Sequence, residues 1–450
     1  MSRLPCFKAY DVRGKIPEEL DAGLVCRIGQ AYAAYLQPRR VAVGRDVRLS
    51  SPDLTEALIA GLTEAGVEVV DLGLCGTEQV YFYTAALRLD GGIMVTASHN
   101  PPDYNGMKFV REGSRPISGD TGLRDIEALA ADNRQQAAPA AGKGRRVSQE
   151  PVADYGKHLL GYVDRQALRP LTVVTNAGNG CAGPVIDALE AHLPFRFIKI
   201  CHQPDGAFPS GVPNPLLPEN REMTGRAVRE HGADVGLAWD GDFDRCFFFD
   251  ERGNFVESYY LIGLLAQALL ARHPGGKIIH DPRLTWNTIE VVQKAGGLPV
   301  LSKTGHAFIK ERMRREDALY GGEMSGHHYF RDFAFCDSGM IPWLLVLEII
   351  CRRREPLSAL IAERQRLFPV SGEINRKVAD PDRVLARVEE SFGPEALSVD
   401  YTDGVSLEGA EWRANLRKSN TEPVLRLNVE TRGSLPLLEE KTKAILAMMV

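Results

Sequence analysis

The sequence has 450 residues, of which 44% are hydrophobic and 25% are charged, and its net charge is −5. This length is too great for one ordinary hydrophobic core and predicts about three or four domains. The composition is that of a globular protein, and the slight acidity gives no indication of a surface that binds nucleic acid or a membrane. We therefore expect no nucleic-acid partner and no membrane partner.

The cysteines and the apolar segments indicate the compartment. The eight cysteines are scattered without a C-x-x-C pair, and the N-terminal segment lacks the apolar core of a signal peptide. The longest apolar runs, 260–271 and 340–351, are too short to cross a bilayer and predict buried helices. These features together predict a cytoplasmic protein with reduced thiols.

A strand–helix–strand pattern recurs three times along the chain. In the first copy, an apolar strand at 41–43 precedes a helix that Ser51 and Pro52 open, and a second strand follows Gly66 at 67–71. The second and third copies begin at Leu171 and Lys277. A further apolar strand follows each copy, at 92–96, 234–239 and 318–320. The alternation predicts three α/β units with parallel sheets.

Two breaks divide the chain. A low-complexity stretch at 131–151 follows the first copy, and another break falls near Pro369, after a basic helix. Beyond Pro369 the pattern is strand, helix, several strands and helix, which is typical of an α+β domain. We therefore predict three similar mixed α/β domains and a C-terminal α+β domain, with bounds 1–147, 148–250, 251–368 and 369–450.

The third strand of each α/β unit ends in an unusual polar loop. The loops begin at Thr96 (T-A-S-H-N-P-P), Asp240 (D-G-D-F-D-R) and Gly321 (G-G-E-M-S-G-H-H). Ligands of open α/β sheets bind beyond the carboxyl ends of the strands. If the three units pack with these ends facing one another, all three loops line one cleft.

Ser98 is a candidate nucleophile. It follows an apolar strand, and Pro101 and Pro102 keep its loop from continuing as a helix. The surrounding sequence is not the G-x-S-x-G of a hydrolase elbow. Adjacent side chains diverge on an extended backbone, so His99 is not an obvious base for Ser98. A plain polar surface turn is the alternative interpretation.

Asp240, Asp242 and Asp244 alternate along one loop after an apolar strand. Three carboxylates on one face of an extended loop form a hard-oxygen site that suits Mg²⁺ or Ca²⁺. An EF-hand is excluded because Arg245 stands where that loop requires glycine. A solvated acidic turn is the alternative, although close aspartates repel without a cation. Such a site needs a further oxygen, and a phosphorylated Ser98 would supply it.

The run Gly178–Gly183 matches G-x-G-x-x-G between a strand and a helix. A dinucleotide site would also need an acidic residue at the end of the next strand, but that strand ends at His202. We interpret the glycines as a tight strand-to-helix turn.

The loop at 321–328 carries Glu323, Ser325, His327 and His328. A carboxylate beside hydroxyl and imidazole groups can bind neighbouring sugar hydroxyls. A zinc site is a rival, weakened because adjacent histidines on extended chain point apart. A turn flanked by glycines and without a functional role is the third interpretation.

The C-terminal segment 417–423 combines arginine, hydroxyl, amide and turn N–H groups, and a strand with Arg426 follows it. These groups suit a phosphate monoester. The alternative is a solvated basic turn.

Four motifs in order, TASHNPPDYNGMK, DGDFDR, GEMSGHHYF and RKSNTEPVLRLNVE, together with the N-terminal FKAYDVRG, resemble the α-D-phosphohexomutase family over essentially the whole chain. Within it, the chain is most similar to bacterial phosphomannomutases. The resemblance implies a heart-shaped four-domain protein. It also implies an isomerase that interconverts mannose 6-phosphate and mannose 1-phosphate through phospho-Ser98 and a hexose 1,6-bisphosphate.

The resemblance implies roles for individual residues. The catalytic group would be Ser98, His99, Asn100, Lys108 and Arg13. One Mg²⁺ per chain would be held by phosphorylated Ser98, Asp240, Asp242 and Asp244. Substrate would be bound by Tyr10, Arg245, His306, Glu323, Ser325, His327, Arg417, Ser419, Asn420, Thr421 and Arg426. The general base stays open among His306, His327, Lys108 and Arg13.

Further expectations concern partners and rival functions. The resemblance implies hexose phosphates as substrates, a hexose 1,6-bisphosphate as activator, and a monomer or weak homodimer. The alternatives are a phosphoglucomutase or a dual-specificity enzyme, a phosphoglucosamine mutase, a non-catalytic sugar-phosphate binding protein, and a phosphatase-like hydrolase. Met324 disfavours the glucosamine enzyme, whose members resemble G-E-Q-S-G-H in this loop.

Overall fold

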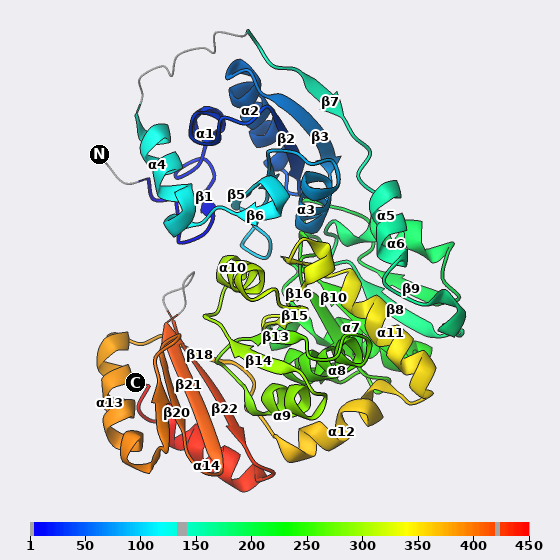
Figure 1. Ribbon diagram of the computed structural model, residues 1–450, viewed down its shortest axis with the longest axis vertical. Coiled ribbons are helices and arrows are strands. Elements are labelled where there is room, and N and C mark those ends of the chain that lie inside the picture. The colour runs from blue at the N-terminus through cyan, green and yellow to red at the C-terminus, as the bar shows by residue number, and fades with distance from the viewer. Residues whose placement is uncertain (1–3, 133–141, 419–423, 450) are drawn as a thin grey trace. The chain divides into compact units, whose positions relative to one another are not determined.

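The computed structural model describes residues 4–132, 142–418 and 424–449 (Figure 1). The chain divides into two compact units. The first comprises Met1–Phe255 and Asp332–Arg353, and the second comprises Val256–Arg331 and Arg354–Val450. Among the described residues, none of the helices combines the length and the apolar composition that crossing a bilayer requires.

The first sheet of the first unit has the strand order β1-β5-β4-β2-β3-β7, with β6 paired to β5. Its strands are β1 (Val12–Lys15), β2 (Arg40–Arg45), β3 (Glu68–Leu74), β4 (Gly91–Val95), β5 (Tyr104–Arg111), β6 (Arg115–Pro116) and β7 (Arg146–Ser148). The accompanying helices are α1 (Ala22–Leu36), α2 (Ser51–Glu64), α3 (Thr77–Ala86) and α4 (Arg124–Ala131). Side chains of α1, α2 and α4 form one apolar core with those of the central strands.

Local sequence explains where these helices begin. Asp21 caps α1, because its carboxylate accepts a hydrogen bond from the amide of Leu24 at 2.7 Å. Pro52 stands in the first turn of α2, where a missing N–H costs nothing. The predicted low-complexity linker contributes the strand β7, which pairs in parallel with β3 and extends the sheet.

The second sheet of this unit has the order β12-β11-β10-β8-β9. Its strands are β8 (Thr172–Asn176), β9 (Arg196–Ile200), β10 (Val235–Trp239), β11 (Cys246–Phe249) and β12 (Phe255–Val256), with helices α5 (Ala153–Leu160), α6 (Ala182–Glu190) and α7 (Glu222–His231). The segment Asp332–Arg353 adds β17 (Cys336–Asp337) and the buried helix α11 (Ile341–Arg353) to the same unit.

In the second unit, a third sheet contains the neighbouring strands β14-β13-β15-β16. They are β13 (Lys277–His280), β14 (Leu298–Leu301), β15 (Tyr320–Gly322) and β16 (His328–Phe330), with helices α8 (Ser258–Arg272), α9 (Trp286–Lys294), α10 (His306–Glu316) and α12 (Leu357–Leu367). The strand predicted at 318–320 is β15. It begins only at Tyr320, although the amide of Leu319 already donates to the carbonyl of Lys277.

The C-terminal sheet is antiparallel, with the order β18-β22-β21-β20-β19 (orange to red in Figure 1). Its elements are β18 (Ile374–Arg376), α13 (Pro381–Phe392), β19 (Ser398–Asp400), β20 (Val405–Glu408), β21 (Trp412–Lys418), β22 (Leu425–Thr431) and α14 (Leu435–Leu446). Apolar side chains of α13 and α14 pack with those of the strands in one core. The predicted α+β pattern is confirmed.

The predicted threefold repeat is confirmed by the pairing of the strands. In each α/β sheet the two strands of the repeat pair in parallel (β2·β3, β8·β9, β13·β14), and the first also pairs in parallel with the following strand (β4, β10, β15). The parallel pairing predicted for the three units is confirmed for these strands, and the sheets as a whole are mixed, as predicted for the three domains. The next strand in each copy (β5, β11, β16) returns directly through a short polar loop and is therefore antiparallel.

Candidate active site

The serine loop, residues 96–104, leaves the carboxyl end of β4 and returns as β5. Ser98 is buried, and its backbone lies in the left-handed region at φ 48°. The amide of Ser98 donates to Oγ1 of Thr96 at 2.9 Å, and the amide of Asn100 donates to the carbonyl of Ala97 at 2.9 Å. These bonds close a tight turn that presents the Ser98 hydroxyl beyond the strand end.

The aspartate loop, residues 240–245, occupies the equivalent position between β10 and β11. Asp240 and Asp242 are fully buried, and Asp244 is 2% exposed. Oxygens of the three carboxylates lie within 4.8 Å of one another. Glycine is required at 241 and 180, because a Cβ on Gly241 would lie 2.8 Å from the carbonyl oxygen of Ser98 and one on Gly180 would lie 2.6 Å from that of Gly241.

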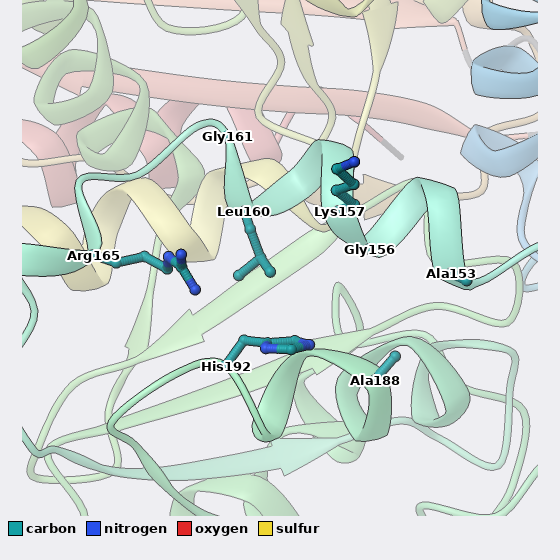
Figure 2. A pocket seen from close by; sticks show the side chains of 8 residues that line it. All are labelled: Ala153, Gly156, Lys157, Leu160, Gly161, Arg165, Ala188 and His192. Carbon is teal, nitrogen blue, oxygen red and sulfur yellow. The ribbon is translucent and has the colours of Figure 1, made fainter.

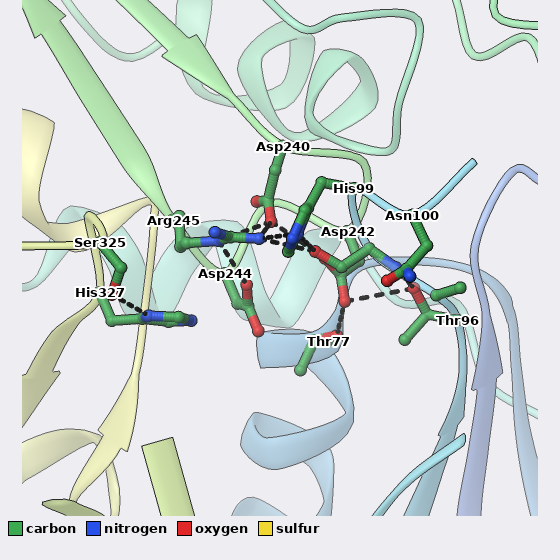
Figure 3. A network of polar contacts seen from close by, with 12 residues as sticks. Thr77, Thr96, His99, Asn100, Asp240, Asp242, Asp244, Arg245, Ser325 and His327 are labelled. Atoms are coloured by element: carbon green, nitrogen blue, oxygen red, sulfur yellow. Dashed lines mark hydrogen bonds and ion pairs between the residues drawn. The ribbon is translucent and has the colours of Figure 1, made fainter. Parts of the chain in front are cut away.

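The two loops meet at the hydroxyl of Ser98. Figure 3 shows the neighbouring His99 beside Asp240 and Arg245 of the aspartate loop. Ser98 Oγ donates to Asp240 Oδ2 at 2.7 Å, and Arg245 Nη2 donates to Ser98 Oγ at 3.0 Å. Arg245 also donates from Nε to Asp240 Oδ2 at 2.8 Å. The serine therefore lies between a carboxylate and a guanidinium, which fixes its oxygen and places positive charge beside it.

The prediction that the side chains of Ser98 and His99 diverge is wrong. His99 Nδ1 lies 3.0 Å from Ser98 Oγ and also contacts Arg245. The prediction assumed an extended backbone, whereas the left-handed conformation of Ser98 turns both side chains to one side. Burial, followed by the charges of Arg245, Arg13 and Lys108, lowers the pKa of His99 well below its usual value. The ring is therefore neutral at physiological pH.

Lys108 lies on β5 and reaches the aspartate loop. Its Nζ donates to Asp242 Oδ2 at 2.7 Å and to Asp244 Oδ2 at 2.5 Å. Burial lowers the pKa of Lys108, but the charges of Asp242 and Asp244 outweigh this effect and the pKa is raised. The side chain is therefore held as an ammonium. Thr77, at the start of α3, also donates from its hydroxyl to Asp242.

The carboxylates fit a divalent cation. Asp240 Oδ1 and Asp242 Oδ1 are buried and accept no hydrogen bond from any residue that the structure describes. Such orphaned acceptors are costly unless a cation or water is available to them. Burial raises the pKa of Asp240 to about 6, with Asp244 and Asp242 adding to the effect and Arg245 opposing it. A bound cation would remove the repulsion that causes part of this shift.

Arg13 and Asn100 complete the surroundings of the serine loop. Arg13 donates from Nη1 to the carbonyl of Ala97 at 3.3 Å and to Asn100 Oδ1, and from Nε to Asp11 Oδ2 at 2.8 Å. Burial lowers the pKa of Arg13, but Asp11 outweighs burial and the pKa is raised. Tyr10 lies half-buried in the N-terminal turn that leads to Arg13.

In the second unit, Glu323 is the centre of the loop between β15 and β16. It is 1% exposed. Its Oε1 accepts a hydrogen bond from the amide of Gly305 at 2.9 Å, and its Oε2 accepts one from the Tyr329 hydroxyl at 2.5 Å and lies 3.4 Å from His327 Nδ1. Burial raises the pKa of Glu323, but His327 and Arg283 outweigh it and the pKa is lowered.

Two further predicted residues lie beside Glu323 in this unit. Ser325 Oγ is 3.2 Å from His327 Nδ1, and the ring of His306, the first residue of α10, lies 6.4 Å from that of His327. His328 points elsewhere, because its Nδ1 lies 2.6 Å from the Tyr320 hydroxyl, and burial lowers its pKa to about 3. The opposite directions of His327 and His328 agree with the argument against zinc.

Arg417 and Arg426 face one another on β21 and β22, and both reach Glu373. Arg417 Nη2 lies 3.3 Å from Glu373 Oε2, and Arg426 Nη1 lies 3.1 Å from Oε1. Arg283 Nη1 also lies 3.3 Å from Glu373 Oε2. Three guanidinium groups thus share one carboxylate. The predicted phosphate-binding residues Ser419, Asn420 and Thr421 lie outside the described residues.

Sequence reasoning missed several of these residues. Thr77, Arg283 and Glu373 follow no motif that the sequence displays, because their roles arise only from tertiary contacts. Arg48, which donates to backbone carbonyls of the serine loop, could have been found from the sequence, since it follows the carboxyl end of β2 and therefore lies at the ligand-binding edge of the sheet. The glycine run at 178–183 is the predicted tight turn, with Gly178 at φ 59° between β8 and α6.

A separate groove lies between α5 and α6 (Figure 2). Its volume is about 670 Å³, and its lining includes Leu160, Ala188, Lys157, Arg165 and His192. None of the predicted site residues lines it.

Sequence models of the phosphoglucomutase/phosphomannomutase family match nearly the whole chain. Its alpha/beta/alpha domains I, II and III match residues 5–137, 153–253 and 257–368, and its C-terminal domain matches residues 373–447. The bounds predicted at 147, 250 and 368 stay predictions, as does the heart-shaped arrangement.

Curated relatives are similar over their full or nearly full length. A phosphomannomutase of Salmonella typhimurium is 61% identical and one of Escherichia coli is 58% identical, each over 100% of both chains. Phosphohexose mutases of Xanthomonas campestris are 60% identical over 98% of both chains. A solved phosphoglucomutase/phosphomannomutase family protein of Burkholderia thailandensis is 33% identical, with a TM-score of 0.88 over 99% of this chain and 98% of that one.

Proposed function

The chain belongs to the phosphoglucomutase/phosphomannomutase family, and on this premise we propose that it interconverts mannose 6-phosphate and mannose 1-phosphate through phosphorylated Ser98. It is an isomerase that acts on hexose phosphates. The observation that carries the proposal is the position of Ser98 Oγ, 2.7 Å from Asp240 Oδ2 and 3.0 Å from Arg245 Nη2.

The residues of the first unit suit a phosphoryl donor. Arg245 already donates to Ser98 Oγ and supplies positive charge beside the bond that must break. Lys108, held as an ammonium, offsets the charge of Asp242 and Asp244. Phosphoryl transfer depends mainly on positioning and charge neutralisation, and these contacts provide both.

Mg²⁺ is the proposed metal, one per chain, with Asp240, Asp242 and Asp244 as its protein ligands and the phosphoserine as a further one. When bound, it would neutralise charge on the phosphoryl group and make the serine a better leaving group. The orphaned oxygens of Asp240 and Asp242 support this assignment. Hard carboxylate oxygens favour Mg²⁺ over softer metals.

In the proposed reaction, a sugar hydroxyl attacks the phosphorus of phospho-Ser98. A bond forms between that hydroxyl oxygen and phosphorus, the bond to Ser98 Oγ breaks, and a base accepts the hydroxyl proton. The hexose 1,6-bisphosphate then turns end for end and returns its other phosphate to Ser98. The raised pKa values of Lys108 and Arg13 disfavour both as the base and leave His306 and His327 as candidates.

Substrate would be held by residues of the second unit and by Tyr10. Glu323, with Ser325 and His327, would bind ring hydroxyls, because its carboxylate is ionised and lies beside an imidazole and a hydroxyl. Arg417 and Arg426, with Ser419, Asn420 and Thr421, would bind the distal phosphate. The cytoplasmic location, the absence of nucleic-acid and membrane partners, the bisphosphate activator and the monomeric or weakly dimeric state remain predictions.

Glucose phosphates are the second candidate substrates, because relatives 60% identical are named phosphohexose mutases. The preferred substrate can be determined by coupled assays with mannose 1-phosphate and glucose 1-phosphate, each with a catalytic amount of the sugar 1,6-bisphosphate. We expect turnover of both and a larger kcat/KM for mannose. Turnover of neither sugar, or release of inorganic phosphate in step with substrate loss, would contradict a mutase.

A further inference from the structure

Arg48 lies beneath the serine loop and binds its backbone. The side chain is 1% exposed. Nη1 donates to the carbonyls of Pro101 at 2.7 Å and Tyr104 at 3.0 Å, and Nη2 donates to those of Ser98 at 2.8 Å and Asn100 at 2.6 Å. One planar cation therefore gathers four carbonyl oxygens of a single loop.

The guanidinium of Arg48 is itself fixed by its neighbours. Nε lies 3.3 Å from Asp46 Oδ2, and the ring of Phe208 lies 5.5 Å from the guanidinium carbon. Asp46 in turn accepts hydrogen bonds from the hydroxyls of Ser51 at 2.5 Å and Thr96 at 2.8 Å. Since Thr96 also binds the amide of Ser98, the same network supports the loop from both ends.

The conformation of the serine loop needs such support. Ser98 has a left-handed backbone at φ 48°, which is unfavourable for a residue other than glycine. Four carbonyl oxygens that converge on one point also repel one another unless a donor satisfies them. Arginine can donate from two nitrogens in a rigid fork, whereas a lysine has one nitrogen and cannot reach all four oxygens.

We propose that Arg48 is a positioning residue, which holds Ser98 Oγ between Asp240 and Arg245 by fixing the carbonyls of residues 98, 100, 101 and 104. The inference rests on the proposed function, because it assigns Arg48 a part in the phosphoryl transfer at Ser98. The hydrogen bonds of Arg48 go to the backbone of the serine loop, and its ion pair goes to Asp46. Its loss should therefore change the chemical step and leave substrate binding unchanged.

The test uses the full-length Arg48→Lys variant. Displacement of a reacting atom by about 1 Å costs roughly 100-fold in rate, so we expect kcat to fall about 100-fold while KM for mannose 1-phosphate stays within about threefold. The single-turnover rate of phosphate transfer from phospho-Ser98 to the sugar should fall by the same factor. A kcat within about threefold of wild type, or an equal rise in KM, would overturn the proposal.

Arg221→Lys is the matched control. Arg221 also donates to two backbone carbonyls, those of Pro215 at 3.0 Å and Leu216 at 2.8 Å, and lies over the ring of Phe255 at 3.6 Å. We expect this variant to lose thermal stability but to keep kcat within about twofold of wild type. If both variants lost kcat equally at matched stability, Arg48 would have only a structural role.

A second variant keeps the proposal testable if Arg48→Lys does not fold. Asp46→Asn preserves size and removes the charge that fixes Arg48 Nε, and we expect a smaller kcat loss of about tenfold with KM unchanged. An unchanged kcat in folded Asp46→Asn protein would then overturn the proposal. Failure of the proposed function is distinguishable, because it would appear in the wild type as turnover without a phosphate on Ser98.

Discussion

The two clusters of charged side chains differ in the sign of their excess. In the first unit, the three aspartates of one loop form ion pairs with Arg245 and Lys108. In the second unit, Arg417 and Arg426 share the carboxylate of Glu373, whereas Arg283, which also reaches it, is paired with Asp281 at 2.7 Å. Buried charges are stable only when paired, so each cluster favours a ligand of the opposite sign to its own excess. The first cluster therefore suits a divalent cation, and the second suits a phosphate.

Ser98→Ala tests the centre of the first cluster and should have the largest effect. We expect kcat to fall roughly 10⁴-fold or more, because the variant lacks the oxygen that carries the phosphate. Intact-mass measurement should find a phosphate on the wild type and none on the variant. Ser210→Ala, which removes an exposed hydroxyl, is the control and should keep full activity. An active Ser98→Ala enzyme would refute the phosphoserine route.

Removal of metal tests the charge argument for the same cluster. We expect excess chelator to reduce turnover at least about 100-fold and Mg²⁺ to restore it better than Zn²⁺, because the protein ligands are all carboxylate oxygens. Turnover assays with elemental analysis measure this. Undiminished activity in a sample shown to contain no metal would mean that Lys108 and Arg245 alone balance the aspartates.

Arg417→Ala tests the second cluster. A charge-assisted hydrogen bond to phosphate contributes about 1.5–3 kcal/mol, so we expect KM to rise roughly ten- to a hundredfold. The same residues must hold the phosphate in both orientations, so the loss should be similar for mannose 6-phosphate and mannose 1-phosphate. Arg376→Ala, an exposed arginine on β18 of the same sheet, is the control. A loss for one isomer alone would contradict a shared phosphate site.

The strands and helix ends that are determined by local sequence could be predicted from the sequence alone. The strand predicted at 234–239 is β10 (Val235–Trp239), and Pro52 and Gly66 mark the ends of α2 as expected. The aspartate triad and Ser98 could be identified because each follows a strand at the ligand-binding edge of its sheet. The orientation of His99 could not be predicted, because it depends on the left-handed backbone of Ser98. The role of Glu373 could not be predicted either, because it arises from contacts with three arginines that lie in distant segments of the sequence.

Glu373→Gln tests the second cluster through the stability of the protein and its dependence on pH. Burial raises the pKa of Glu373, but Arg283, Arg426 and Arg417 outweigh it and hold the pKa at about 2, below the usual 4.5. A carboxyl whose folded pKa is depressed adds stability above its unfolded pKa, and this stability is lost as the pH falls from about 4.5 to about 2. The shift corresponds to about 3 kcal/mol at neutral pH.

The free energy of unfolding of wild type and Glu373→Gln, measured with urea at several pH values, provides the test. The difference should be about 3 kcal/mol at pH 7 and should shrink towards zero near pH 2. Glu440→Gln removes an exposed carboxylate of α14 and should show a small difference at every pH. A difference in the free energy of unfolding between wild type and Glu373→Gln that did not change with pH would show that the three arginines do not stabilise the ionised form of Glu373. The proposal that this cluster binds phosphate would then rest on Arg417 and Arg426 alone, without a contribution from Glu373.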